Sequence, residues 1–134
     1  FRKTVKDNGK AAKELLNEIK IDCKDNIEMS EMVNLTSKTL DYILENRDDQ
    51  EMLSCISYDY LMGFGYLIGG WLMDKAKISA NKHLSKSSRN EIFLKSKIVS
   101  AEFYDFHILP RIEYHLKVVM KGAKVVQTTN DSFI

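Results

Sequence analysis

The side chains of this sequence best suited to acid–base or metal chemistry are its three histidines, His83, His107 and His115. Di-iron carboxylate sites in helical bundles use a Glu-x-x-His spacing, and no histidine here follows a glutamate at that distance. No pairing of a nucleophile with a base can be recognised from the spacing either. We therefore predict no metal site and no catalytic residue, and we expect His107 and His115 to be solvated near Asp105 and Glu113.

The two cysteines, Cys23 and Cys55, form neither a disulfide framework nor a Cys-x-x-Cys pair. Cys55 lies in an apolar stretch, where a free thiol behaves as a small buried hydrophobic group. We expect both cysteines to be reduced and mostly buried. This expectation indicates a reducing compartment, and therefore a cytoplasmic location.

An uncharged stretch of fourteen residues, Tyr60 to Met73, holds four of the six glycines. A dinucleotide-binding Gly-x-Gly-x-x-Gly fingerprint would need glycine at the position of Ile68 and a preceding strand, and neither is present. A membrane span would need about 20 apolar residues, and extending the stretch back to Met52 includes Asp59. The sequence thus predicts no cofactor-binding residue and no transmembrane segment here.

The same stretch is better explained as a buried helix that a neighbouring helix approaches closely. Gly65 and Gly69 are four residues apart, which places them on one face of a helix. Each glycine costs roughly 1 kcal/mol of helix propensity, which tight packing must offset. We predict that Gly65, Gly69, Gly70 and Trp71 are helix-packing residues.

The elements that position these residues should all be helices, because apolar residues recur at helical spacing and the sequence has a single proline. The sequence predicts an all-α fold, an antiparallel four-helix bundle with two long C-terminal helices, the last kinked at Pro110. We expect residues 1–134 to form a single helical domain. The predicted helices cover residues 3–21, 26–47, 50–84 and 89–121, and residues 122–134 form an extended tail.

Capping residues mark several of these helix ends. Asn26 is the predicted N-cap of the second helix, and Asp48 or Asp49 that of the third. Ser88 and Glu91 have the Ser-x-x-Glu spacing of a capping box at the start of the fourth helix, which Gly122 should end. An apolar stripe that runs from Leu53 to Ile78 marks the third helix as the central one.

The charges are nearly balanced at a net charge of +1, which argues against nucleic acid as a partner. They are unevenly distributed along the chain, however. Residues 1–67 carry 9 basic and 13 acidic side chains, and residues 68–134 carry 11 and 6. Packing the two halves against each other would therefore be electrostatically favourable.

The uncharged helix and the helix after it share a series of short motifs with a known family. These are Tyr60-Leu61, Phe64-Gly65, Gly69-Gly70-Trp71, Phe93-Leu94-Lys95-Ser96-Lys97-Ile98, Ala101, Phe103-Tyr104 and Leu109-Pro110. Their order and spacing resemble the C-terminal domain of large bacterial acyl-CoA dehydrogenases, such as 3-methylmercaptopropionyl-CoA dehydrogenase and its relatives. The resemblance covers residues 58–134, and residues 1–57 match in helical pattern and position.

This resemblance implies a parent enzyme that oxidises an acyl-CoA to the 2-enoyl-CoA. A separate, more N-terminal dehydrogenase core would bind FAD and the CoA thioester and supply the glutamate that abstracts the α-proton. No glutamate of this sequence matches that base, so we assign no catalytic or flavin-binding residue to this segment. Its expected role is docking on the core or assembly of a homo-oligomer of the parent.

Two function classes remain open at this stage. The first is the auxiliary module of a flavoenzyme, favoured by the ordered motifs and by a chain that opens at Phe1 without an initiator methionine. The second is a stand-alone helical protein-interaction module with the same bundle. Sequence alone leaves the acyl-CoA substrate, the electron acceptor and the oligomeric state of the parent undetermined.

A lysine-rich turn between the third and fourth predicted helices is the candidate docking surface. Lys75, Lys82 and Lys86 are its principal residues. They could be ordinary solvated side chains, or they could meet an acidic face of the dehydrogenase core, CoA phosphates or anionic lipid headgroups. Of the binding alternatives, docking on the core ranks first.

Overall fold

The structure is a computed structural model that describes residues 2–86, 90–122 and 132. These residues contain helices and no strand, which confirms the predicted all-α fold. The helical elements are α1 (Arg2–Lys6), α2 (Lys10–Asp22), α3 (Ile27–Glu45), α4 (Gln50–Lys86), α5 (Glu91–Phe103), the π-helix η1 (Tyr104–Ile108) and α6 (Pro110–Lys121).

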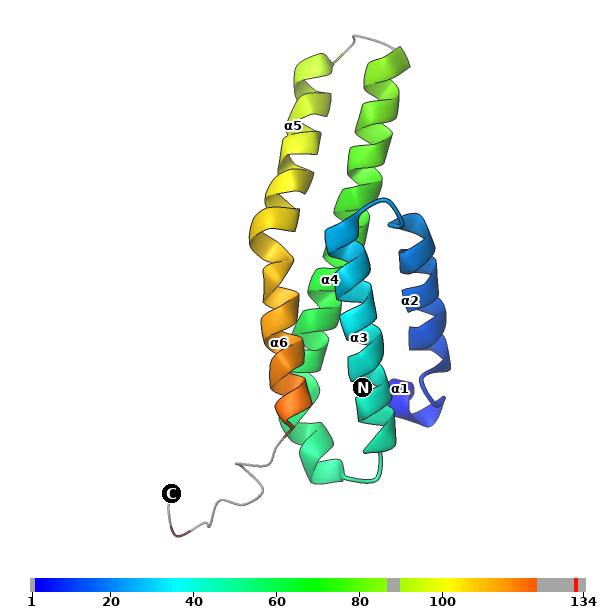
Figure 1. Ribbon diagram of the computed structural model, residues 1–134, viewed down its shortest axis with the longest axis vertical. Coiled ribbons are helices and arrows are strands. Elements are labelled where there is room, and N and C mark those ends of the chain that lie inside the picture. Colours follow the sequence, from blue (N-terminus) through cyan, green and yellow to red (C-terminus); the bar gives the residue numbers. More distant parts are fainter. Residues whose placement is uncertain (1, 87–89, 123–131, 133–134) are drawn as a thin grey trace.

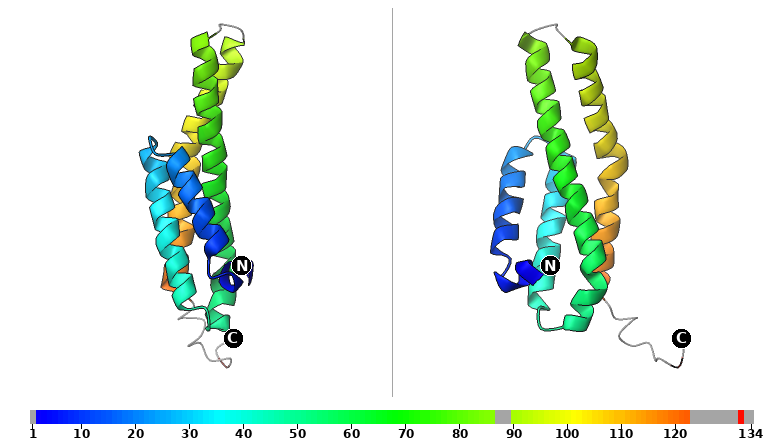
Figure 2. Two further views of the ribbon diagram at one scale, coloured as in Figure 1. Left: turned by 90° about the vertical axis from the view of Figure 1, so that its right-hand side faces the viewer. Right: turned by 180° about the vertical axis from the view of Figure 1, so that it is seen from behind.

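Successive long helices run in opposite directions, and α5, η1 and α6 together form one bent rod beside α4 (Figure 1). The helices α2, α3 and α6 and the part of α4 up to Asp74 and Lys75 make a four-helix bundle, as predicted. The rest of α4 and α5 extend well beyond α2 and α3 as a two-helix hairpin (Figures 1 and 2). The bundle therefore ends well short of the tip of the hairpin, and no other described helix lies beside that tip.

The first predicted helix is in fact two helices, α1 and α2. The chain breaks at Asn8 and Gly9, which have φ angles of 59° and 75°. Asp7 stabilises the break, because its carboxylate accepts hydrogen bonds from the amides of Gly9 (2.9 Å) and Ala11 (3.1 Å). Gly9 also lies against Leu44, where a Cβ would come within 2.7 Å of Leu44 Cδ1, so glycine suits the site in both shape and conformation.

The predicted caps of α3 and α4 are confirmed. Asn26 Oδ1 accepts a hydrogen bond from the amide of Met29 at 3.1 Å, and Asp49 Oδ1 accepts one from the amide of Met52 at 3.0 Å. At the capping box predicted for the next helix, Ser88 lies outside the described residues. The described part of α5 begins at Glu91, after Asn90 in the left-handed region (φ 62°).

The predicted bend at Pro110 is confirmed, and the π-helix η1 explains its form. Leu109 donates its amide hydrogen to the carbonyl of Tyr104, five residues back, at 3.0 Å. This wider turn accommodates the proline, which has no amide hydrogen, at the first position of α6. Gly122 (φ 64°) ends α6 as predicted, and of the tail predicted to follow it only Ser132 is described.

The core lies between α2, α3, α4 and α6. Its fully buried large side chains are Ile19, Met29, Val33, Leu40, Ile43, Ile56, Leu67, Leu109, Ile112, Leu116 and Val119. In the hairpin, by contrast, α5 buries only Ala101 completely. Ile78, predicted to face inward, is exposed, because it lies one turn beyond Lys75, the residue of α4 that pairs with the end of α2.

Candidate docking surface

The buried face of α4 is lined by glycines that bring other elements close. A Cβ on Gly63 would lie 2.8 Å from Leu116 Cδ2 of α6, and a Cβ on Gly70 would lie 2.8 Å from Leu109 Cδ2. At Gly69 the nearest atom would be the hydroxyl oxygen of Tyr104, which donates to the carbonyl of Tyr66 at 2.7 Å. Gly63, which the sequence reasoning missed, and Gly70 are seven residues apart and share one helix face.

The prediction that Gly65 packs against a neighbouring helix is wrong. Gly65 is exposed, and a Cβ built there would meet no heavy atom of the described residues within 4 Å. Two residues along a helix from Gly63 correspond to roughly 200° of rotation, so Gly65 points away from the core. Trp71 is half-buried and joins α4 to α2, because its Nε1 donates to Asp22 Oδ2 at 2.9 Å.

Gly65 belongs to a solvent-facing row of apolar residues on α4. We call this row the α4 face; its members, three or four residues apart, are Tyr58, Leu61, Gly65, Ile68 and Leu72. Tyr58, Leu61 and Leu72 are between 56% and 68% exposed. Seen from behind, α4 lies in front of the other helices and no described helix crosses it (Figure 2).

A groove with a volume of about 500 Å³ runs beside the α4 face, between α4 and α2. Its walls are mainly apolar and include Ala11, Ala12, Leu15, Leu61, Phe64 and Ile68. The groove adjoins a second one, of about 480 Å³, which also contains Ser57 and is lined by Arg2 and Lys6 of α1. An apolar surface with basic residues at one end thus covers the outer side of α2 and α4.

The structure disperses the three lysines of the predicted docking cluster. Lys75 is not at the hairpin tip: its Nζ lies 3.6 Å from Asp22 Oδ2 and 4.2 Å from the centre of the Trp71 ring, within the α2–α4 junction. Lys82 and Lys86 are exposed near the tip, and no ion pair of theirs occurs among the described residues. Among the residues that the structure describes, the part of the cluster without an ion pair is therefore Lys82 and Lys86.

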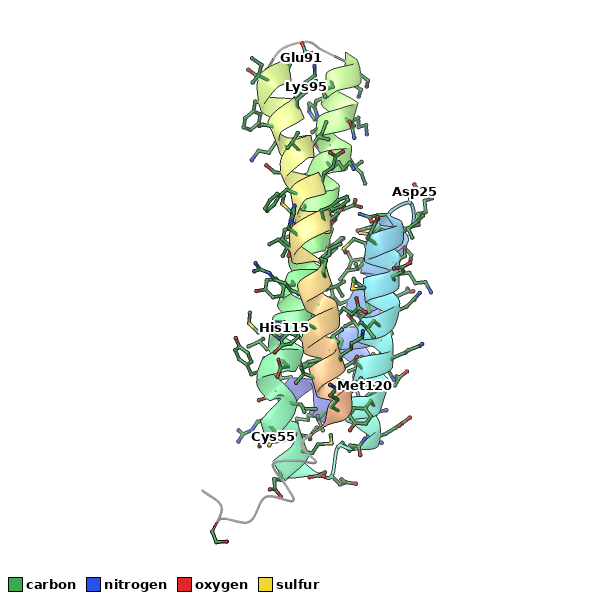
Figure 3. The ribbon with its side chains drawn as sticks, turned by 60° about the vertical axis from the view of Figure 1, so that its left-hand side comes forward. Asp25, Cys55, Glu91, Lys95, His115 and Met120 are labelled. Atoms are coloured by element: carbon green, nitrogen blue, oxygen red, sulfur yellow. The ribbon has the colours of Figure 1, made fainter. Side chains whose placement is uncertain are left out.

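A histidine–aspartate pair links α4 to α6, and sequence reasoning missed it. His115 Nδ1 lies 2.7 Å from Asp59 Oδ1, and their side chains are only 12% and 18% exposed. The Tyr66 ring stacks on His115 with a centroid distance of 5.9 Å. Figure 3 shows His115 against α4, so the prediction of a solvated His115 is wrong. His107, by contrast, is exposed beside Phe103, as predicted for a solvated side chain.

The rings around this pair belong to Tyr58, Tyr66 and Tyr114. The hydrogen bond between Asp59 and His115 and the rings around it join α4 to α6. Within the described residues, no group of three or more histidine, cysteine and acidic side chains could hold a metal ion.

A second polar cluster lies where α3 begins. Asn26 donates through Nδ2 to Asp74 Oδ1 (3.1 Å) and to Asp105 Oδ2 (3.2 Å). Burial raises the pKa of Asp105. The hydrogen bond from Asn26 lowers this pKa in part, and the charge of Asp74 raises it. Burial, followed by the influence of Asp74, also raises the pKa of Cys23 to about 12. Cys23 is buried as predicted, but Cys55 is exposed, which corrects the prediction for that residue.

The comparison with protein families decides what kind of chain carries these surfaces. A family model described as acetyl-CoA dehydrogenase C-terminal like matches residues 7–129. The chain belongs to this family. The family match also includes most of the first 57 residues, for which the sequence had offered only a helical pattern. No curated protein matches the chain.

In this member of the acetyl-CoA dehydrogenase C-terminal-like family, no helix within residues 2–86 or 90–122 is both long enough and apolar enough to cross a membrane.

The cofactor of acyl-CoA dehydrogenases, FAD, does not fit the groove beside α4. The groove offers the hydroxyl groups of Thr4, Ser57, Tyr58 and Tyr60, but no arginine or lysine lines its described walls to bind a diphosphate.

Proposed function

We propose that this chain is the C-terminal helical module of an FAD-dependent acyl-CoA dehydrogenase, and that it serves docking and assembly rather than chemistry. The observation that carries the proposal is the family match over residues 7–129. In this proposal the parent oxidises an acyl-CoA to the 2-enoyl-CoA in the cytoplasm. FAD and the catalytic base belong to the dehydrogenase core, and the 3-methylmercaptopropionyl-CoA dehydrogenases are the expected subfamily.

The surface that we assign to docking on the core is an apolar row on the projecting hairpin. We call it the α5 row; it consists of Ile92, Val99, Phe103 and Phe106. These four side chains are between 58% and 87% exposed. Ile92, Val99 and Phe103 are spaced by seven and four residues, so they share the side of α5 that points away from the buried Ala101.

Exposed apolar rows of this kind mark interaction sites, because isolated proteins rarely leave several large apolar side chains together in water. Lys82 and Lys86, on the other helix of the hairpin, add positive charge near its tip, at the end where Ile92 lies. A hairpin with an apolar row and two free lysines is suited to a partner surface that is apolar with an acidic margin. Docking on the dehydrogenase core is therefore favoured over the binding of CoA phosphates or lipid headgroups.

The test is to express the dehydrogenase core and residues 1–134 as separate chains and to mix them before size-exclusion chromatography. We expect the two chains to co-elute. The core alone should carry the flavin absorption band and oxidise acyl-CoA with a dye acceptor, while residues 1–134 alone should do neither. Val99→Asp with Phe103→Asp should abolish co-elution, because two buried charges oppose the apolar contact.

The matched control is Asn17→Asp with Asn34→Asp, which adds the same charge on exposed positions of α2 and α3. A stoichiometric flavin band in purified residues 1–134 would overturn the assignment of FAD to the core. Failure of the wild-type chains to co-elute would instead favour the stand-alone interaction module.

A further inference from the structure

The α4 face has a two-fold pattern centred on Gly65. Its members lie seven and four residues before Gly65 and three and seven residues after it: Tyr58, Leu61, Ile68 and Leu72. We propose that this face binds the same face of a second copy of the chain, with the two α4 helices antiparallel and crossing at Gly65. The inference rests on the proposed function and deepens it, since it names the surface and the partner that assemble the enzyme.

The open space at Gly65 suits such a crossing. A Cβ there would meet no heavy atom of the described residues within 4 Å, so Gly65 forms a notch in the row. Glycine at a crossing point lets two helix backbones approach closely. In the antiparallel arrangement, Leu61 of one copy lies opposite Ile68 of the other, and Tyr58 lies opposite Leu72. Large apolar side chains thus meet on both sides of the notch.

The charges beside the α4 face match the same arrangement. Arg2 and Lys6 lie next to Ser54 and Ser57, toward the start of α4. Acidic residues of α2 lie toward the other end, where Asp22 pairs with Lys75 and Glu18 is exposed one turn before it. Ser54 and Lys75 are each about 15 Å along α4 from Gly65, from a rise of 1.5 Å per residue.

A two-fold axis at Gly65 therefore brings Arg2 and Lys6 of each copy toward Glu18 of the other. A parallel pairing would instead place like charges together and remove the symmetry of the apolar row. These features favour a second copy over an unrelated partner, because an isologous interface needs one surface that is complementary to itself. A pair of this kind closes on itself and leaves the α5 row of both copies free for the core.

Cysteine cross-linking tests the proposed axis directly. The helices of residues 1–134 bury a core of their own, so the experiment uses this segment by itself. Circular dichroism checks that each variant is folded. In a Cys55→Ser background, we expect Gly65→Cys to form a disulfide-linked dimer under mild oxidation, because a residue on the axis meets its own copy. The control Asn34→Cys, on the exposed side of α3, should form no disulfide-linked dimer under the same conditions.

A mixed experiment tests the antiparallel register. Tyr58→Cys and Leu72→Cys, each alone, should cross-link poorly, whereas an equimolar mixture should give a heterodimer several times more efficiently. Equal cross-linking of Gly65→Cys and Asn34→Cys, or no preference for the mixture, would overturn the proposed geometry.

Sedimentation provides a readout without cysteines. Gly65→Leu should weaken the dimer by about tenfold or more, because it fills the notch, and its melting curve at monomeric concentrations should stay cooperative. Wild-type residues 1–134 that stay monomeric at every concentration while co-eluting with the core would overturn this inference alone. Loss of co-elution with an intact dimer would overturn docking through the α5 row and leave this inference standing.

Discussion

Single glycines distinguish the two sides of α4. Gly70→Ala should destabilise the fold by about 1–3 kcal/mol, because the added methyl group would collide with Leu109 and Met29 in the core. Gly65→Ala should stabilise the monomer by up to about 1 kcal/mol, since the new side chain meets open space and alanine favours the helix. Urea denaturation at dilute protein concentration measures both changes, and equal effects of the two variants would contradict this assignment of the faces.

The polar cluster at Asn26 should make stability depend on pH through Asp105. Burial raises the pKa of Asp105 above its ordinary 3.8, so the folded protein holds this proton more tightly than the unfolded chain does. The stability that protonated Asp105 contributes is present at acidic pH and is lost as pH rises through the raised pKa. Asp105→Asn should therefore raise the melting temperature by a few degrees at pH 7 and have little effect below the ordinary carboxyl pKa.

Asp41→Asn, on the exposed side of α3, is the control for that titration. A stabilisation by Asp105→Asn that is the same at pH 3 and pH 7 would show that the carboxylate charge is not the cause.

At this scale the sequence predicts local interactions better than distant ones. The caps Asn26 and Asp49 act on amides three residues away, so their spacing is visible in the sequence. The Asp59–His115 pair joins residues 56 positions apart, and only the packing of α4 on α6 brings them together. The orientation of Gly65 was missed because four glycines spread along an uncharged helix do not reveal which side of the helix packs against its neighbours.

For whole elements, the π-helix η1 determines what Pro110 does. A proline inside a regular α-helix costs about 3 kcal/mol, so its removal would normally be stabilising. Here η1 already accommodates the ring, and Pro110 occupies the first turn of α6, where it restricts the unfolded chain. We expect Pro110→Ala to leave stability unchanged or to lower it by up to about 1 kcal/mol in chemical denaturation. A gain near 3 kcal/mol would mean that the proline strains the rod.

The positions of the helices follow from the sequence because the apolar period of 3.6 residues extends over many turns. Two interruptions were not located as such. The break at Asn8 and Gly9 lies against Leu44, which belongs to another helix, and the π-helix contains Tyr104, whose hydroxyl group donates to the carbonyl of Tyr66 in α4. Both interruptions therefore involve contacts with residues far away in the sequence.

For the whole molecule, the two free lysines of the hairpin give a salt-dependent prediction. Lys82→Glu with Lys86→Glu should weaken association with the dehydrogenase core by several-fold at low salt, and high salt should reduce the difference. Lys24→Glu with Lys38→Glu, exposed in the α2–α3 connection and on α3, is the matched control. Titration calorimetry at two ionic strengths measures the effect, and identical binding of both variants would return Lys82 and Lys86 to ordinary solvated side chains.

The fold class and the family could be predicted from the sequence, because the helical period and the order of the motifs extend over most of the chain. The shape could not, since the predicted helix lengths do not state which part of α4 is covered by α2 and α3, and these two helices end beside Asp74 and Lys75. That difference moved Lys75 from the expected tip into the α2–α4 junction.

The wider turn of η1 also means that the direction in which α5 faces can change in evolution while the position of α6 stays the same. A π-helix holds one residue more than the α-helical turn it replaces, and each residue turns an α-helix by about 100°. Loss of one codon between Tyr104 and Ile108 would leave α6 seated in the bundle but rotate α5 by that angle relative to it. Ile92, Val99 and Phe103 would then face a different direction. One small deletion could thus present a different side of α5 to a partner while α6 keeps its place in the bundle.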